Sequence, residues 1–238
     1  MENILQVNGL VKNFGGFTAL QGVDLHIAPG ERLGLIGPNG SGKTTLISCI
    51  AGALQNDSGT IRFNGDLIGH MPAYVRTRKG IARSFQIPRP FTSMTVVENL
   101  MVPLAYVGGM TGTKAKDQAM QILADMGLAS KAESAIKHLS QVELRKMELA
   151  RAMAAKPKLL ISDEAMAGLA GAEVDEVLQI LFDLNKTGIT IIMIEHIMQA
   201  VMKFSQRVVC LDAGKIICEG TPEDIVKNPE VQRAYLGD

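Results

Sequence analysis

The sequence lacks the features of membrane-spanning, secreted and nucleic-acid-binding proteins. No apolar run approaches the roughly 18 residues of a membrane span, and the segment 189–194 has only the length of a strand. The 24 basic and 24 acidic residues give a formal net charge of zero, whereas nucleic-acid binding usually needs a basic face. Glu2 and Asn3 precede a short alternating strand, not the apolar segment of a signal peptide. These absences predict a soluble, cytoplasmic protein with no nucleic-acid partner.

Cysteine is scarce as well. Cys49, Cys210 and Cys218 form an odd, unclustered set, each within an apolar run. This usage is typical of buried free thiols in a reducing compartment and indicates no metal site. The chain contains no repeat or low-complexity segment, and its 238 residues are 47% hydrophobic. A complete core is therefore available for one large α/β domain or two small ones.

The sequence does contain a glycine-rich segment at 37–44, Gly-Pro-Asn-Gly-Ser-Gly-Lys-Thr, with the spacing G-x-x-x-x-G-K-[ST]. It lies between an apolar strand, 32–36, and a predicted helix, 45–51. In such a loop, backbone N–H groups turn toward phosphate oxygens, and the helix N-terminus adds its positive dipole end. Lys43 is expected to reach the β- and γ-phosphates, and the Thr44 hydroxyl to hold Mg²⁺. The strand and helix disfavour the alternative of a glycine-rich turn with a surface lysine.

Hydrophobic patterning divides the single domain, 1–238, into a core (1–86 and 158–238) and an inserted α-helical subdomain (87–157). After Pro157 strands alternate with helices, which implies a mainly parallel sheet with covering helices. The N-terminal strands predict a separate antiparallel β subdomain. The expected strands are 3–11, 19–27, 32–36, 59–63, 158–162, 189–194 and 207–211, and the expected helices 45–51, 95–101, 114–126, 141–155, 172–186, 196–204 and one beginning at Thr221.

Two core strands end in residues suited to hydrolysis. The strand 158–162 is followed by Asp163 and Glu164, which should emerge beside the phosphate loop because parallel strands direct ligand chemistry to their C-terminal ends. Asp163 is expected in the Mg²⁺ shell, directly or through water, and Glu164 is expected to orient or deprotonate the attacking water. His196 follows the strand 189–194 in the same way, with a helix-capping or core histidine as the alternative.

With these motifs in place, essentially the whole chain resembles an ABC-transporter nucleotide-binding domain with a P-loop NTPase core. The resemblance makes Glu164 the general base, His196 a switch histidine at the γ-phosphate, and Gln86 a sensor of Mg²⁺ and the membrane partner. It places Phe14 against adenine, with a core contact as the competing interpretation and Phe17 as the other candidate ring. The residues assigned to the site are, for catalysis, Glu164, His196, Gln86 and Lys43; for the nucleotide, Phe14, Pro38, Asn39, Gly40, Ser41, Gly42, Lys43, Thr44, Thr45 and Ser140; and for the metal, Thr44, Gln86 and Asp163.

The segments 85–100 and 220–237 resemble the ATPase subunits of branched-chain amino-acid importers. The resemblance implies ATP and Mg²⁺ as ligands, and hydrolysis that drives import of branched-chain or related amino acids. It implies that the chain forms a head-to-tail dimer, either a homodimer or a heterodimer with a second ATPase subunit. It also implies that the chain binds membrane permease subunits at the inner face of the cell membrane. The alternatives are a regulatory subunit with weak hydrolysis, the ATPase of a related lipid or urea/amide transporter, and a soluble ABC ATPase of DNA repair or translation.

The chain departs from the family at the signature motif, usually Leu-Ser-Gly-Gly-Gln, which here reads Leu-Ser-Gln-Val-Glu at 139–143. Val142 is expected to obstruct the approach of the backbone to the opposite subunit's γ-phosphate. Glu143 adds a negative charge, and like charges about 4 Å apart cost roughly 4 kcal/mol at a dielectric near 20. Ser140 and Glu143 also form a capping box, which retains the helix start. Further on, Ala165 replaces a usual proline, and Leu169-Ala170-Gly171 lacks the family's Asn/Asp-Pro.

Overall fold

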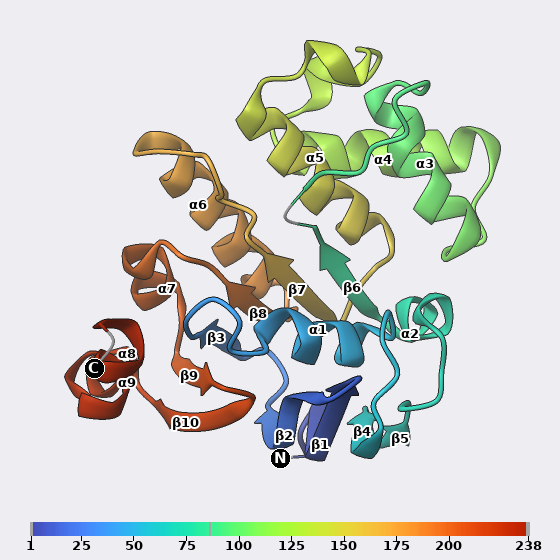
Figure 1. Cartoon of the computed structure of the whole chain (residues 1–238). Coiled ribbons are helices and arrows are strands. Elements are labelled where there is room, and N and C mark those ends of the chain that lie inside the picture. Colours follow the sequence, from blue (N-terminus) through green and yellow to red (C-terminus); the bar gives the residue numbers. More distant parts are fainter. Residues whose placement is uncertain (1, 86, 237–238) are drawn as a thin grey trace.

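The computed structural model describes residues 2–85 and 87–236. Its main sheet has six strands in the order β10-β9-β3-β8-β7-β6, and Figure 1 shows it at the centre of the molecule. Five strands are parallel, and β10 pairs antiparallel with β9 at one edge. The strands are β3 (Arg32–Ile36), β6 (Ile81–Ser84), β7 (Leu159–Asp163), β8 (Thr190–Ile194), β9 (Arg207–Asp212) and β10 (Lys215–Gly220).

The second sheet is antiparallel, in the order β2-β1-β4-β5, and lies at the N-terminal end of the chain in Figure 1. Its first two strands meet at the turn Gly15-Gly16, as the alternating pattern predicts, and β4 pairs with β1. The α/β fold with a mainly parallel sheet and an antiparallel β sheet is therefore confirmed. The strands are β1 (Leu5–Phe14), β2 (Phe17–Ile27), β4 (Ser58–Phe63) and β5 (Asp66–Leu67).

Most of the helices form three groups. In Figure 1, α3, α4 and α5 lie together beyond the edge strand β6, whereas α6 lies beside β8 and α7 beside β3. Helices α8 and α9 lie beside β9 and β10 at the C-terminal end. The helices are α1 (Lys43–Ala51), α2 (Ala73–Lys79), α3 (Val96–Tyr106), α4 (Gly112–Asp125), α5 (Gln141–Ala154), α6 (Ala172–Lys186), α7 (Met198–Phe204), α8 (Pro222–Lys227) and α9 (Pro229–Leu236), with short 3₁₀ turns at Ala129–Lys131 and Ile136–His138.

Capping boxes begin three of these helices. The hydroxyls of Thr95, Ser140 and Thr221 each accept a hydrogen bond from the backbone N–H three residues on. These boxes satisfy N–H groups that have no partner within the helix. Helix α3 continues to Tyr106, beyond its predicted end at 101, and includes Pro103. Buried Leu100 and Leu104 anchor this helix, so packing offsets the hydrogen bond that proline removes.

The main sheet is buried on both faces. Along β8, Ile191 and Met193 belong to one hydrophobic cluster, and Ile192 and Ile194 to another. Because successive strand side chains point to opposite faces, one cluster fills each side of the sheet. The first cluster includes residues of α3 to α7, and the second includes residues of α1, β1, β2 and β4. This burial explains why β3, β7 and β8 read as continuous apolar runs.

The prediction of three buried cysteines needs correction. All three cysteines are free, and Cys49 and Cys210 are buried, but Cys218 is only half-buried because it lies in the edge strand β10. Helix α5 buries Arg145, Lys146 and Glu148 as well as its apolar face. Lys146 is ion-paired with Glu176 of α6, which compensates its burial.

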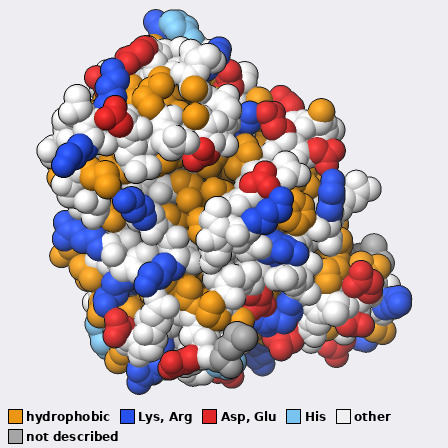
Figure 2. Space-filling view, turned by 180° about the vertical axis from the view of Figure 1, so that it is seen from behind, with side chains coloured by type: hydrophobic (Ala, Val, Ile, Leu, Met, Phe, Trp, Pro, Cys, Tyr) orange, Lys and Arg blue, Asp and Glu red, His pale blue; other side chains and the backbone are white. Residues whose placement is uncertain are grey.

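The surface combines charges of both signs. Figure 2 shows positive and negative side chains interspersed over one face, with hydrophobic side chains gathered near its centre. This face therefore carries no field of a single sign. In the part of the chain that the structure describes, none of the helices combines the length and apolarity needed to cross a bilayer.

Candidate nucleotide site

The phosphate loop connects β3, in the interior of the main sheet, to α1. A Cβ atom on Gly37, with φ +147°, would lie 2.0 Å from the Leu211 carbonyl oxygen, so only glycine fits against β9. Gly42 precedes α1 with φ +107°, where a Cβ would lie 2.8 Å from the Ala19 carbonyl oxygen. The two glycines let the backbone turn tightly between the sheet and the helix N-terminus. This is the geometry that a helix N-terminus needs to bind an anion.

Lys43 is buried within the loop that it belongs to. Its Nζ donates hydrogen bonds to the carbonyl oxygens of Gly37 at 2.7 Å and Pro38 at 3.0 Å. Burial lowers the pKa of the Lys43 ammonium, while the carboxylates of Glu164 and Asp163 oppose this shift. Lys43 therefore interacts electrostatically with Glu164 and Asp163, the two acids that the sequence predicts for the site.

A cavity of about 290 Å³ opens over this loop. It brings together most residues that the sequence assigns to the site, from β1, β2, the loop, and the ends of β7 and β8. Its volume is slightly below the usual range for small-molecule sites. The lining residues are Phe14, Phe17, Ala19, Asn39, Gly40, Ser41, Gly42, Lys43, Thr44, Thr45, Glu164 and His196.

Glu164 and His196 face each other in this cavity. His196 Nε2 lies 3.0 Å from Glu164 Oε1, within hydrogen-bond distance. Glu164 adopts φ +49°, an unusual conformation for a residue with a side chain, and its N–H donates to the Ile194 carbonyl oxygen at 2.8 Å. This backbone bond links the end of β7 to the end of β8, and so brings the carboxylate and the imidazole together. His196 is exposed, so it is not a core histidine, and the N-cap residue of α7 is Ile197, which has no side-chain cap hydrogen bond.

Asp163 is buried, and its carboxylate is ion-paired with Arg83. Arg83 Nη2 and Nε lie 2.5 Å and 3.1 Å from Asp163 Oδ2, and Arg83 Nη1 donates to Ser48 Oγ at 3.1 Å. The sequence did not single out Arg83, which lies on β6. It connects the predicted metal carboxylate to helix α1, which follows the phosphate loop.

The oxygen donors suit Mg²⁺. Thr44 is exposed in the cavity, and Asp163 is a buried carboxylate at the end of β7, which β8 separates from β3. Mg²⁺ is usually held by one or two protein oxygens, substrate phosphates and water, so this small donor set fits it. Gln86, the third predicted ligand, lies outside the described residues.

Phe14 and Phe17 both line the cavity. Phe14 is 47% exposed and Phe17 is 62% exposed, so the alternative of a hydrophobic core contact for Phe14 is wrong. Lys12 Nζ lies 5.6 Å from the Phe14 ring centroid, close enough for a cation–π contact. Both rings therefore remain candidates to contact a nucleobase.

The altered signature segment forms the N-terminus of α5. Ser140 N donates to Glu143 Oε2 at 2.8 Å, and Glu143 N to Ser140 Oγ at 3.3 Å, so the predicted capping box is present. The hydrogen bond from Ser140 lowers the pKa of Glu143 and keeps it ionised. Lys131 Nζ lies 3.4 Å from Glu143 Oε1 and compensates part of its charge. Ser140 lies outside the described lining of the phosphate-loop cavity in its own chain.

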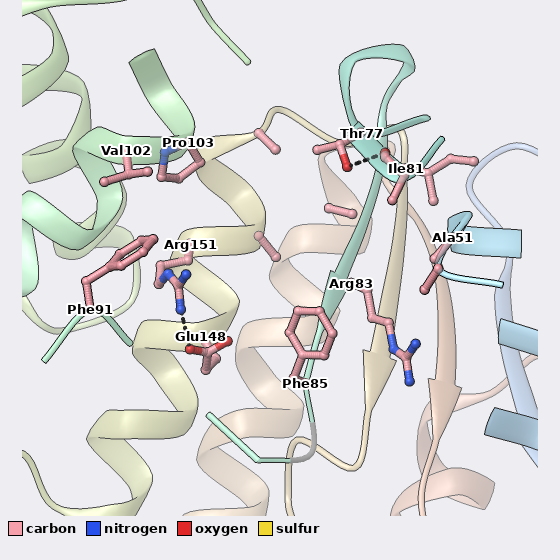
Figure 3. A pocket seen from close by; sticks show the side chains of 15 residues that line it. Ala51, Thr77, Ile81, Arg83, Phe85, Phe91, Val102, Pro103, Glu148 and Arg151 are labelled. Atoms are coloured by element: carbon pink, nitrogen blue, oxygen red, sulfur yellow. Dashed lines mark hydrogen bonds and ion pairs between the residues drawn. The ribbon is translucent and has the colours of Figure 1, made fainter. Parts of the chain in front are cut away.

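A second cavity, of about 280 Å³, lies between β6 and the helices α3 and α5 (Figure 3). Phe85 and Phe91 line it, and the Phe85 ring centroid lies 5.4 Å from the Arg83 guanidinium. Arg151 is paired with buried Glu148 at 2.7 Å on the α5 side of the cavity. The second cavity thus adjoins Arg83, which also holds Asp163.

Glu195 is a buried acid that directly precedes His196, with 3% exposure. Burial raises its pKa to about 7 from 4.5. The folded protein therefore binds more protons than the unfolded chain between these values, and its stability falls as pH rises through this window. The full shift corresponds to about 3 kcal/mol. We expect Glu195→Gln, which can keep the hydrogen bond from Met166 N, to flatten this pH dependence.

Urea unfolding at several pH values from 5 to 8.5 measures the effect. The stability difference between the variant and the wild type should grow in favour of the variant as pH rises. A parallel pH dependence in both proteins would contradict the expectation. Glu173→Gln, on the exposed first turn of α6, is the matched control.

Comparisons with known proteins agree with this geometry. The ABC transporter family model matches residues 20–167, and a branched-chain amino acid ATP-binding cassette transporter model matches residues 215–238. The high-affinity branched-chain amino acid transport ATP-binding protein LivG of Escherichia coli K12 is 37% identical, over 100% of this chain and 99% of LivG. The lipopolysaccharide export system ATP-binding protein LptB of Haemophilus influenzae is 32% identical, over 99% of this chain and 98% of LptB.

A solved ATP-binding cassette of an ABC transporter in its ADP conformation has the same fold. It superimposes with a TM-score of 0.90 at 30% identity, and the match covers 100% of both chains. The phosphate loop, the paired Glu164 and His196 and this full-length similarity lead to one conclusion. The chain belongs to the ATP-binding subunits of ABC transporters, a family of ATP-hydrolysing cassettes.

Proposed function

We propose that this chain hydrolyses ATP to drive the import of branched-chain or related amino acids. The observation that carries the proposal is the pairing of Glu164 with His196 over the phosphate-loop cavity. It places a candidate base and a candidate γ-phosphate contact beside a loop built for phosphate. The substrate class is supported by LivG and by the branched-chain model that matches the C-terminal residues 215–238.

In this proposal each residue acts on a defined part of ATP. The loop N–H groups and Lys43 bind the β- and γ-phosphates, and Glu164 orients and deprotonates the attacking water. His196 contacts the γ-phosphate, and Gln86 senses the metal and the membrane partner. Bound Mg²⁺, held by Thr44, Asp163 and Gln86, would neutralise charge on the phosphates. The proposed nucleotide contacts are Pro38, Asn39, Gly40, Ser41, Gly42, Lys43, Thr44 and Thr45, with Phe14 or Phe17 at the base.

The site is completed by a second ATPase subunit in a head-to-tail dimer. Ser140 is outside the described lining of the phosphate-loop cavity of its own chain. This position supports an arrangement in which Ser140 contacts nucleotide bound by the partner. Val142 and Glu143 would make that contact a poor one. A homodimer of this chain would then hold two weak sites. A heterodimer, in which the second subunit carries an intact signature, would hold one good site.

We further propose a single nucleotide-binding domain, with a core at 1–86 and 158–238 and a helical subdomain at 87–157. Permease subunits would contact it at the second cavity, beside Phe85, at the inner face of the cell membrane. The exposed aromatic rings of Phe85 and Phe91 support this docking, because such rings are enriched in protein interfaces.

Transport by the purified complex tests the proposal. The tagged chain, purified in detergent with ATP, should retain its permease subunits. After reconstitution into vesicles with the external binding protein, the complex should take up radiolabelled leucine only when ATP is present. Urea is the control solute. Failure to take up any branched-chain amino acid would contradict the substrate class.

A regulatory subunit with weak hydrolysis is the second candidate, favoured by the altered segment 139–143. ATPase assays with and without a second ATPase subunit distinguish the two. ATPase activity that appears only with the second subunit would favour the heterodimer. Weak ATPase activity both with and without the second subunit would favour the regulatory role. The similarity to LptB supports the ATPase subunit of a lipid transporter as the alternative function.

A further inference from the structure

The C-terminal helix α9 reaches the phosphate loop through one hydroxyl group. Gly37 N donates a hydrogen bond to Tyr235 Oη at 2.8 Å, across 198 residues of sequence. Gly37 is the first residue of the loop, and Tyr235 lies outside the described lining of the nucleotide cavity. The contact therefore acts on the loop backbone and not on the ligand.

The same C-terminal segment holds the loop at a second point. Gly214 N, in the turn between β9 and β10, donates to the Ser41 carbonyl oxygen at 2.9 Å. Two backbone groups of the loop, one an N–H and one a C=O, are thus bound by residues after β9. Buried Ile225 of α8 and Val231 of α9 anchor this segment in the hydrophobic cluster of the main sheet.

Gly37 has little freedom to satisfy its N–H elsewhere. Its Cβ position would lie 2.0 Å from the Leu211 carbonyl oxygen, so the residue is pressed against the end of β9. A backbone N–H in such a crowded place loses free energy when it has no acceptor. The Tyr235 oxygen is the acceptor that the fold supplies, although the tyrosine itself remains 43% exposed.

Tyr235 is suited to this role because its hydroxyl stays neutral. Burial raises the pKa of the phenol above its usual value, and the hydrogen bond from Gly37 opposes the shift. A neutral phenol can accept from a backbone N–H without placing a negative charge near a triphosphate site. A phenylalanine at this position would preserve the ring and remove the acceptor alone.

We propose that Tyr235 is a positioning residue for the phosphate loop, and that docking of α9 on Gly37 raises the affinity of the loop for nucleotide. The inference rests on nucleotide binding by this loop, as proposed above. Coupling between two sites is reciprocal, so bound nucleotide must stabilise the docking of α9 by the same factor. The C-terminal segment, which matches the branched-chain transporter model, then acts as part of the nucleotide site.

Tyr235→Phe tests the contact directly. We expect the Kd for ADP with Mg²⁺, measured by isothermal titration calorimetry, to rise roughly three- to tenfold, in line with the loss of one hydrogen bond. Hydrogen exchange at the Gly37 amide, followed without nucleotide, should become faster. Tyr106→Phe, at a tyrosine that is 74% exposed, is the matched control and should change neither quantity.

The outcomes separate the inference from the function on which it rests. A wild-type chain that does not bind ADP would contradict the proposed function. A wild-type chain that binds ADP, with a variant whose affinity and Gly37 exchange are unchanged, would overturn the inference alone.

A reciprocal experiment begins with the wild type, so its first measurement is independent of any folding defect in the variant. Saturating ADP should slow hydrogen exchange in the peptide 229–236, and Tyr235→Phe should remove most of that protection. A purely structural role for Tyr235 would not make exchange in α9 depend on nucleotide. Equal exchange in this peptide with and without ADP would overturn the proposal.

Discussion

Replacing Glu164 by glutamine is expected to abolish ATP turnover while ATP binding is retained. Glutamine keeps the size of the side chain and an oxygen that can face His196, but it cannot accept the proton of the attacking water. General base catalysis contributes roughly 100- to 10,000-fold, so phosphate release should fall by at least the lower figure. Phosphate release and titration with ATP measure the two quantities separately. Size-exclusion chromatography in ATP should show a trapped dimer.

The control for this change is Glu173→Gln, which alters an exposed acid on α6. It should leave turnover within about twofold of the wild type, since surface substitutions away from special features have small effects. Loss of ATP binding in Glu164→Gln would contradict the base role, because it would show that the carboxylate is needed to hold the ligand. Retained turnover would place the base elsewhere.

Repair of the altered signature is expected to raise turnover about tenfold. In the proposed head-to-tail dimer, the double substitution Val142→Gly, Glu143→Gln restores close backbone approach and removes a negative charge near the partner's triphosphate. A tenfold increase corresponds to about 1.4 kcal/mol, well below the 4 kcal/mol of an unscreened pair, because Lys131 already lies 3.4 Å from Glu143. Steady-state ATPase activity over a range of protein concentrations measures the gain.

The glutamine in this variant has a further purpose. Ser-x-x-Gln still forms a capping box, so α5 keeps its N-terminal hydrogen bonds. Glycine near the start of the helix lowers stability by about 1 kcal/mol at most. The single substitution Glu143→Gln removes only the charge, so its turnover separates the effect of the charge from that of the obstruction by Val142. Unchanged activity in the double variant would contradict the hypothesis that the signature limits hydrolysis.

The core of the fold could be predicted because its strands are buried on both faces. β3 begins and ends at the predicted residues, and β7 and β8 differ from prediction by one residue at their ends. The edge strands β6 and β10 were missed, since each mixes charged and apolar residues and lacks a continuous apolar run. Helix α2 was missed as well. Its Arg76 is fully buried and donates to the carbonyl oxygens of Met71, Cys49, Ile50 and Gly69, which a local pattern cannot indicate.

In the candidate site as well, residues in local motifs could be predicted, whereas residues with partners distant in the sequence could not. The phosphate loop, Asp163, Glu164 and His196 are recognisable because short motifs follow core strands. Arg83 and Tyr235 are not, because their partners lie 80 and 198 residues away. Only the folded sheet order brings β6 beside β7, and only the docked C-terminus brings α9 to the start of the loop.

The hydrogen bonds of Lys43 to Gly37 and Pro38 influence what kind of ligand the phosphate loop can accept. The ammonium group has three N–H donors, and two of them bind carbonyl oxygens, so the third donor and the positive charge are available to an incoming molecule. Phosphate oxygens with full negative charge can bind there strongly, whereas a neutral nucleoside offers no equivalent interaction. The internal contacts also keep the loop in shape before binding, which lowers the ordering entropy lost on association. Selection for polyphosphates thus begins with Lys43 and the loop backbone, before any base or metal is recognised.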